Sequence, residues 1–250
     1  EEGDFVGIFG PNGSGKSTLA RQLNGLLSPD RGQVLVCGQD TADKKARSSL
    51  WKKAGLVFQF PEQQIFQTSI YNEVAYGPRN LGLSEDEIGE RVRQALHMVG
   101  LAAEEMAGLT PFSLSGGMKR RIAIAGLLAL QPEILILDEP MAGLDPAGRG
   151  MIVDIIRQRR EKKATTLMIS HDLKEIINLA DKIAILDEGA LVFFGSTGEL
   201  LGRPDILQRY RLQLPVYLQV VYALREKQLP VKPNVGSIEE AAAEIIKLHP

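Results

Sequence analysis

The chain has 250 residues, 44% hydrophobic and 24% charged, as in an ordinary globular protein, so whole-chain disorder, a collagen repeat and a continuous coiled coil are not expected. Its 29 basic and 31 acidic residues give a formal net charge of −2, which provides no electrostatic basis for binding nucleic acid. The single cysteine, Cys37, excludes an internal disulfide and suits a reducing compartment, and no apolar run approaches the roughly 18 residues of a membrane-spanning helix.

The first predicted elements are a buried strand, a glycine-rich loop and a helix. The apolar run Phe5–Phe9 predicts the strand, and Leu19–Leu27 has the periodicity of a helix. The loop between them reads Gly10-Pro11-Asn12-Gly13-Ser14-Gly15-Lys16-Ser17-Thr18. This order of strand, loop and helix is the context that a nucleotide phosphate loop requires. Further strands are predicted at Gln33–Gly38 and Gly55–Phe58.

The spacing from Gly10 to Ser17 is the full pattern of a phosphate loop, Gly-x4-Gly-Lys-Ser. Glycines let backbone N–H groups converge on phosphate oxygens without Cβ clashes, and the helix N-terminus adds a favourable dipole. Lys16 is expected to reach the β- and γ-phosphates, and Ser17 to hold Mg²⁺. The alternative, a tight turn with a surface lysine, is disfavoured by the strand before the loop and the helix after it.

Residues from about 63 to 132 have the pattern of helices. An apolar stripe at helical spacing consists of Ile88, Val92, Leu96 and Val99. Ser84 with Glu87 predicts a capping box at the start of this helix. A second helix is predicted over 115–130. Three adjacent cations on it, interpreted as a solvated helix face, are Lys119, Arg120 and Arg121.

Strands and helices alternate again after residue 132. Buried strands are predicted at 134–137, 166–169 and 183–186, and helices at about 147–161 and 173–180. This alternation indicates a parallel sheet wound with helices. The pattern weakens after Ser196, where two further helices are predicted at 215–227 and 237–248.

Two acids end the predicted strand at 134–137. Because adjacent residues of a strand point opposite ways, one acid can face a metal ion and the other the γ-phosphate. Asp138 suits the metal, and Glu139 suits the general base that orients the attacking water. The alternative is that both are ordinary turn or cap residues.

A second candidate anion site begins the helix predicted over 115–130. Ser115, Gly116 and Gly117 stand at its N-terminus, where backbone N–H groups and the helix dipole favour an anion. The alternative is an ordinary Ser N-cap next to a flexible joint. Two phosphate-type sites with one hydrolytic acid pair suggest a nucleotide shared between two copies.

Together these motifs resemble the ATP-binding-cassette (ABC) ATPases. In that family's order the chain has a phosphate loop at 10–18, a glutamine loop at Gln59, a signature at 114–118, the acids 138–139, a Gly-Leu-Asp segment ending at Asp145, and His171. The match spans about residues 3–195. More narrowly, three segments resemble the ATPases of energy-coupling-factor vitamin and metal importers: 58–66, 142–149 and 214–248.

The resemblance implies further roles for individual residues. Gln59 is expected to contact Mg²⁺ and the lytic water and to relay the nucleotide state to a transmembrane partner. His171 is expected to hydrogen-bond the γ-phosphate; without the resemblance it also reads as a structural histidine near a strand end. Asp145 is expected at the subunit interface. The Ser115-Gly116-Gly117 segment is expected to bind the γ-phosphate held by the other subunit.

The chain departs from the family pattern in two places. The fifth signature residue is usually Gln, and here it is Met118, whose thioether cannot replace the amide donors, so weaker nucleotide capture is expected. The family normally has more chain before the phosphate loop, including an aromatic residue that stacks on adenine. Either the sequence is truncated or the stacking comes from elsewhere, because the strand position of Phe5 argues for the core.

The fold class expected from these observations is α/β, with a P-loop NTPase core and a mostly parallel sheet. Residues 1–62 and 133–196 are expected to form the ATPase core, 63–132 an inserted helical signature subdomain, and 197–250 a small C-terminal helical appendage.

The expected function is that of an ATP-binding, Mg²⁺-dependent ATP-hydrolysing motor subunit of an ABC importer, of the energy-coupling-factor type, for a vitamin or transition-metal ion. The expected partners are a second ATPase subunit (an identical copy or a paralogue), a transmembrane coupling protein and a substrate-binding membrane subunit, with no nucleic acid. The expected location is peripheral, at the cytoplasmic face of the cell membrane. Alternatives are a conventional ABC importer ATPase, a non-transport ABC ATPase acting on DNA or ribosomes, and an inactive regulatory cassette.

Overall fold

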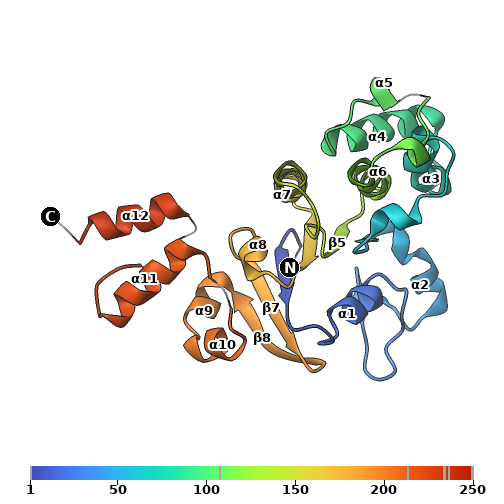
Figure 1. Ribbon diagram of the computed structural model, residues 1–250. Helices are drawn as coiled ribbons and strands as arrows, with labels where there is room; N and C mark the ends of the chain where they lie inside the picture. The colour runs from blue at the N-terminus through green and yellow to red at the C-terminus, as the bar shows by residue number, and fades with distance from the viewer. Residues whose placement is uncertain (1, 107, 213, 233–234, 236, 249–250) are drawn as a thin grey trace. The chain divides into compact units, whose positions relative to one another are not determined.

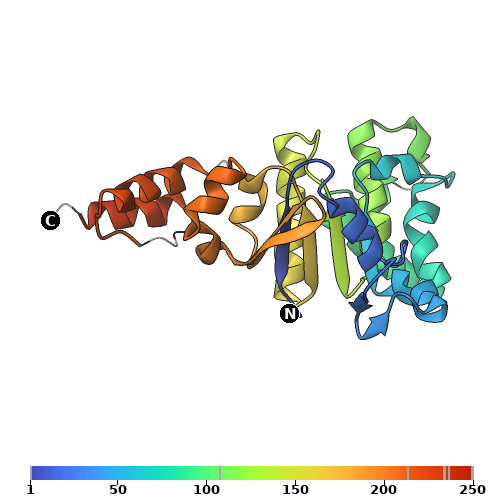
Figure 2. The same ribbon diagram turned by 90° about the horizontal axis from the view of Figure 1, so that it is seen from below.

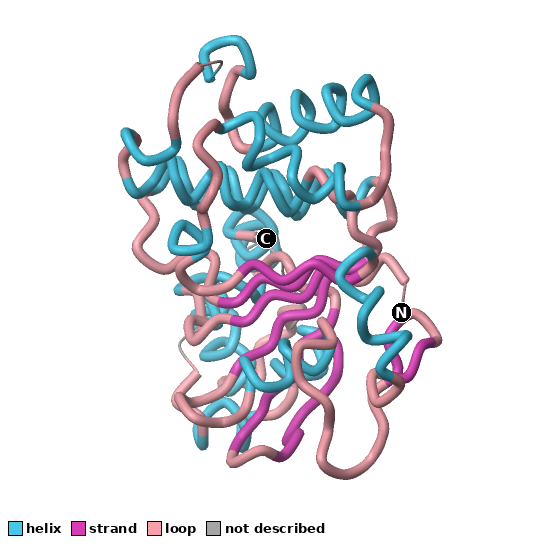
Figure 3. The backbone as a smooth tube through the Cα atoms, turned by 90° about the vertical axis from the view of Figure 1, so that its right-hand side faces the viewer, coloured by secondary structure: helices cyan, strands magenta, loops and turns pink. Residues whose placement is uncertain are grey.

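The computed structural model describes residues 2–106, 108–212, 214–232, 235 and 237–248. Its internal contacts divide the chain into two compact units. The first unit comprises 1–3 and 17–169, and the second comprises 4–16 and 170–250. The strands, magenta in Figure 3, include β4-β5-β6 side by side in the first unit and β1-β7-β8 side by side in the second.

The strands of the first unit are parallel and buried. They are β4 (Ala54–Val57), β5 (Ile134–Asp138) and β6 (Thr165–Ile169). Val57 pairs with Leu137, and Leu137 pairs with Met168, so the three strands share one register and end at the same edge. Leu135, Ile136 and Leu137 are 0–1% exposed, as expected for a strand covered on both faces.

Helices of the first unit surround these strands. They are α1 (Lys16–Leu23), α2 (Lys44–Ser49), α3 (Ile70–Asn80), α4 (Glu85–Met98), α5 (Ala103–Met106), α6 (Gly116–Leu128) and α7 (Pro146–Glu161), with short 3-10 helices η1 (Leu50–Lys52), η2 (Pro61–Gln64) and η3 (Pro111–Ser113). Helices α3, α4 and α6 pack on one another and are drawn in teal to green in Figure 2. The predicted helical content of 63–132 is therefore confirmed.

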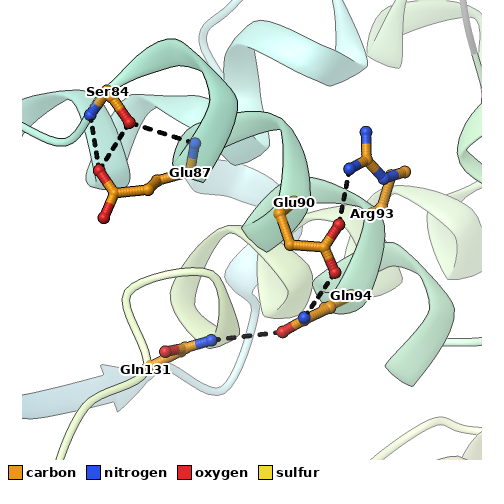
Figure 4. A network of polar contacts seen from close by, with 6 residues as sticks. All are labelled: Ser84, Glu87, Glu90, Arg93, Gln94 and Gln131. Atoms are coloured by element: carbon orange, nitrogen blue, oxygen red, sulfur yellow. Dashed lines mark hydrogen bonds and ion pairs between the residues drawn. The ribbon is translucent and has the colours of Figure 1, made fainter.

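The predicted capping box at the start of α4 is confirmed (Figure 4). The Ser84 hydroxyl accepts a hydrogen bond from the Glu87 N–H, and the Glu87 carboxylate accepts one from the Ser84 N–H at 3.0 Å. On the same helix Glu90 binds Arg93 and Gln94, and Gln131 donates to Gln94 at 3.5 Å. The four apolar residues of the predicted stripe are 0–2% exposed. Three of them form the buried face of α4, and the fourth, Val99, is its C-cap.

The prediction of one continuous strand over Gln33–Gly38 is wrong. The structure has a two-stranded hairpin instead, β2 (Leu35–Val36) and β3 (Gln39–Asp40). Cys37 and Gly38 form its turn with φ of +48° and +73°, and a turn with two positive φ values matches the twist of a tight hairpin.

The second unit is built on β1 (Phe5–Phe9), β7 (Lys182–Asp187) and β8 (Ala190–Ser196). β1 and β7 are parallel, whereas β7 and β8 are antiparallel. With the parallel pairs of the first unit, most of these strand pairs are therefore parallel, as predicted. Its helices are α8 (Leu173–Ile177), α9 (Thr197–Leu201), α10 (Pro204–Arg209), α11 (Val216–Glu226) and α12 (Ile238–Ile246). One apolar cluster links β7 to α8, α9 and α11 through Ile176, Ile183, Leu200 and Leu218.

The sequence patterns predicted α11 and α12 but not β8, α9 or α10. The boundaries of the two units also differ from the three predicted segments, since 63–132 lies wholly inside the first unit. Figure 1 labels α3, α4, α5 and α6, the α-helices of this segment. The division into core, helical subdomain and appendage stays a prediction.

Candidate functional site

The loop after β1 is closed around its own lysine. Lys16 is only 8% exposed, and its Nζ donates hydrogen bonds to the carbonyl oxygens of Gly10 and Pro11, both at 2.8 Å. Gly13 and Gly15 have φ of +82° and +97°, in the left-handed region that glycine adopts without strain. A Cβ at Gly10 would lie 2.1 Å from the Leu186 carbonyl oxygen, so no larger residue fits there. The loop is therefore a compact turn whose cation lies inside it.

The residues of this loop fit a phosphate-bearing ligand. The Ser14 hydroxyl oxygen is buried and has no hydrogen-bond partner among the described residues, and an unpaired buried hydroxyl costs free energy. Ser17 and Thr18 stand in the first turn of α1, where backbone N–H groups lack partners within the helix. Unpaired donors, a helix N-terminus and a lysine together suit an anion with several oxygens.

The acid pair stands at the end of β5. Asp138 is the last residue of the strand, pairs with Ile169 and is 8% exposed. The Glu139 N–H donates to the Ile169 carbonyl at 3.0 Å, but Glu139 itself has a φ of +51°. Alternation along a strand therefore ends at Asp138 and does not set the direction of Glu139. A left-handed backbone at a residue with a side chain is uncommon and costs of order 1–3 kcal/mol.

Arg120 on α6 holds the turn that contains Glu139. Its two Nη atoms donate to the carbonyl oxygens of Ala142 (2.9 Å), Glu139 (3.2 Å) and Pro140 (2.9 Å). Arg120 is 6% exposed, so its interpretation as part of a solvated helix face is wrong. Burial lowers the pKa of its guanidinium, and the negative charge of Glu62 raises it by a smaller amount.

The Ser115-Gly116-Gly117 segment begins α6. Ser115 is the N-cap, and its hydroxyl accepts a hydrogen bond from the Met118 N–H at 3.3 Å. The two glycines are exposed, and a Cβ at either would meet nothing within 4 Å. Ser115 is therefore the N-cap of α6, and the N-terminus of this helix is open on the surface of the first unit.

Asp145 and Gln59 are the remaining predicted site residues of the first unit. Asp145 is the N-cap of α7, and its carboxylate accepts a hydrogen bond from the Gly148 N–H at 2.7 Å. Gln59 is exposed and follows β4 by two residues. The first unit thus carries Ser17, Thr18, Gln59, Ser115, Gly116, Gly117, Asp138, Glu139 and Asp145.

In the second unit His171 lies between Ser170 and Asp172, and these neighbours order its backbone. The Ser170 N–H donates to the Ile8 carbonyl at 3.1 Å, and the Ser170 hydroxyl accepts from the Asp172 N–H at 3.0 Å. Asp172 then caps α8. His171 is exposed beside this fixed segment. The second unit thus carries the loop residues Gly10, Pro11, Asn12, Gly13, Ser14, Gly15 and Lys16 together with His171.

Comparison with known proteins agrees with this set of motifs. The profile of the ABC transporter family matches residues 1–142. The energy-coupling factor transporter ATP-binding protein EcfA2 of Caldanaerobacter subterraneus subsp. tengcongensis is 44% identical over 249 residues, which cover 99% of this chain and 87% of that protein. Its namesake from Clostridium perfringens is 42% identical over 250 residues, with coverages of 99% and 88%.

Solved structures with the same fold include the cbiO1 protein of Clostridium perfringens, described as part of the ABC transporter complex cbiONQ. It is 34% identical with a TM-score of 0.72, covering 90% of this chain and 88% of that one. The ATP-binding cassette MJ0796, described as a dimer bound to ADP and Pi, is 29% identical with a TM-score of 0.69 and coverages of 79% and 87%. The chain belongs to the ABC transporter family, among the ATP-binding proteins of energy-coupling factor transporters.

Proposed function

We propose that this chain binds and hydrolyses ATP as the motor subunit of an energy-coupling factor importer for a vitamin or a transition-metal ion. The observation that carries the proposal is the phosphate loop, in which Lys16 is buried against the Gly10 and Pro11 carbonyls while the Ser14 hydroxyl lacks a partner. Relatives named as energy-coupling factor transporter ATP-binding proteins match 99% of the chain, which supports the importer class.

Residues 10–18 are proposed to hold the triphosphate, with Lys16 at the β- and γ-phosphates. Ser17, Gln59 and Asp138 offer a hydroxyl, an amide and a carboxylate oxygen, which are the hard ligands that Mg²⁺ prefers. When bound, Mg²⁺ neutralises charge that develops on the phosphate oxygens. Glu139 is proposed to orient and deprotonate the attacking water, and His171 to hydrogen-bond the γ-phosphate.

A second ATPase subunit, an identical copy or a paralogue, is proposed to complete each site. The open N-terminus of α6 supports this proposal, because Ser115, Gly116 and Gly117 leave its amide groups accessible from outside the first unit. Asp145 precedes the exposed start of α7 and is proposed to lie at the same subunit interface. The dimeric description of MJ0796 is consistent with such a pair.

The proposed membrane partners are a transmembrane coupling protein and a substrate-binding membrane subunit. Along the described parts of this chain, no helix has the length and apolar character needed to cross a bilayer. Exposed aromatic side chains on the first unit support a docking surface: Phe60, Phe66, Tyr71, Tyr76 and Phe112 are each 40–57% exposed. Phe66 and Tyr76 stack edge to face with centroids 4.9 Å apart. Exposed aromatic side chains are typical of protein interfaces. The subunit is proposed to lie at the cytoplasmic face of the membrane.

The test is the variant Glu139→Gln in the complex purified from detergent-solubilised membranes. We expect ATP binding to persist and steady-state hydrolysis to be abolished, because the amide cannot accept the water proton. Glu133→Gln, one residue before the other end of β5, is the matched control and should hydrolyse ATP normally. Normal turnover by Glu139→Gln contradicts the assignment of the base. Recovery of the chain with DNA or ribosomes, and without membrane proteins, contradicts the importer assignment.

A further inference from the structure

The guanidinium of Arg120 donates its hydrogen bonds to carbonyl oxygens of one backbone turn. Glu139, Pro140 and Ala142 each supply a carbonyl oxygen to it, and the Ala142 N–H closes the same turn onto the Glu139 carbonyl at 3.3 Å. A carbonyl whose oxygen is held in this way fixes the ψ angle of its residue. The left-handed Glu139 backbone, with a φ of +51°, is therefore held between the Ile169 carbonyl on its N–H side and Arg120 on its carbonyl side.

This contact links two motifs that are distant in the sequence. Arg120 lies in the second turn of α6, the helix that begins with the Ser115-Gly116-Gly117 segment. Glu139 directly follows β5. A shift or rotation of α6 is transmitted to the Glu139 backbone, because the planar guanidinium offers a rigid fork of donors.

Arg120 also faces the segment that follows Gln59. Helix η2 (Pro61–Gln64) packs on α6. The Glu62 Oε2 and the Arg120 Nε are both buried, and neither has a hydrogen-bond partner among the described residues. The Glu62 charge nevertheless acts on the guanidinium. An acceptor and a donor of opposite charge on packed elements, each without another partner among the described residues, are complementary, so movement of η2 toward α6 would favour a hydrogen bond between them.

We propose that Arg120 is a positioning residue for Glu139, and that Glu62 acts through Arg120 to couple the segment after Gln59 to the same backbone turn. This inference rests on the proposed role of Glu139 as the general base. Arg120 touches neither nucleotide nor water in this scheme. Arg120 holds the base in the orientation that the reaction needs. A movement of either η2 or α6 would act on Glu139 through Arg120.

The test measures kcat, KM and ATP affinity of Arg120→Lys in the purified transporter complex. Lysine keeps the charge but loses the fork that spans three carbonyls. We expect kcat to fall on the order of 10²-fold, because a misplaced catalytic group has this effect, while KM and ATP affinity stay within about twofold.

Arg159→Lys is the matched control for a purely structural loss. Arg159 is also 6% exposed and also binds carbonyls, those of Pro132, Glu133 and Thr165, but at the opposite ends of β5 and β6. We expect both lysine variants to lower the melting temperature and only Arg120→Lys to lower kcat selectively. Equal losses of kcat in the two variants, or a change in ATP affinity that matches the change in kcat, overturn the positioning role.

Glu62→Gln tests the second half of the inference and keeps the buried fork intact if Arg120→Lys fails to fold. We expect a several-fold lower kcat, and no further loss when the change is added to Arg120→Lys. Gln63→Ala, on the exposed neighbour in η2, should have no effect. Wild-type kcat in Glu62→Gln overturns the coupling through Glu62. If Glu139→Gln is itself fully active, the proposed base fails; if Glu139→Gln is inactive and Arg120→Lys retains kcat, only the positioning role fails.

Discussion

The Nζ atom of Lys16 lies 2.8 Å from the carbonyl oxygen of Gly10, six residues earlier in the chain. This bond, and its equivalent to Pro11, fix the position of the cation within the loop. Donors that are already in position need no rearrangement when negative charge develops in the transition state. This preorganisation is usually the largest contribution to electrostatic catalysis. The lysine thus shapes the loop and also serves as its principal charge.

Lys16→Ala is expected to weaken ATP binding by about 10- to 100-fold, because charge-assisted hydrogen bonds contribute roughly 1.5–3 kcal/mol each. Titration calorimetry with ATP checks this value. Lys44→Ala, on the exposed surface of α2, removes the same charge elsewhere and should bind ATP normally. An unchanged dissociation constant for Lys16→Ala contradicts the proposed phosphate contact.

Gly117→Ala is expected to leave the subunit as stable as the wild type, or more stable by about 0.5–1 kcal/mol, because alanine favours a helix and the added Cβ meets nothing within 4 Å. Turnover of the assembled complex should nevertheless fall roughly tenfold or more, since the methyl group enters the surface that is proposed to face the second subunit's nucleotide. Gly150→Ala is the control: its Cβ is equally unobstructed, and it lies on the exposed face of α7. Denaturation and ATPase assays are compared, and full activity of Gly117→Ala contradicts the shared site.

Gly7→Ala is expected to destabilise the second unit by about 1–3 kcal/mol, the usual cost of overpacking a core. A Cβ at Gly7 would lie 1.8 Å from the Ile176 Cγ2 atom, where α8 crosses β1. Ile176→Ala removes that atom but also leaves a cavity, so in denaturant titrations the two changes together should cost less free energy of unfolding than the sum of their separate costs. If Gly7→Ala alone is as stable as the wild type, α8 does not pack on β1 as described.

Cys37 should react slowly with iodoacetamide, because its pKa lies above the ordinary 9.0: burial raises it most, and a hydrogen bond to Glu133 adds to this. The thiolate fraction at pH 8 is therefore small, and the alkylation rate should still rise as pH passes 9.0. Glu133→Gln removes the neighbouring negative charge, lowers the thiol pKa and should speed the reaction at pH 8. A rate that levels off below pH 9.0 contradicts the assignment.

The elements that sequence patterns predicted best are those coded locally. The phosphate loop and strands β1 and β5 depend on consecutive residues, such as the buried Leu135–Leu137 run. The hairpin around Cys37 escaped prediction because its apolar residues read as one continuous strand, and a non-glycine turn residue gives no signal of a positive φ. Strand β8 did carry a signal, the Glu188-Gly189 turn with both φ values positive between two apolar runs.

The candidate site also contains a contact that local sequence patterns do not predict. Lys119, Arg120 and Arg121 form one charged run, and charge alone does not say which side chain faces inward. Arg120, Ile124 and Leu128 are spaced by four residues and are all buried, so helical spacing with two apolar residues is the available sign of its burial. The carbonyls it binds follow β5, about twenty residues further along the chain, and no local pattern encodes that contact.

The central claim is that the N-terminus of α6 serves the nucleotide held by a second ATPase subunit. Backbone amide exchange of Ser115–Lys119 in Glu139→Gln, measured in the intact complex with and without ATP, tests it most directly. We predict that ATP strongly slows exchange in this segment in the complex and leaves it fast in the isolated chain, because only a facing subunit can deliver the phosphate to these amides. Fast exchange in the ATP-loaded complex, or equal protection in the isolated chain, contradicts the claim.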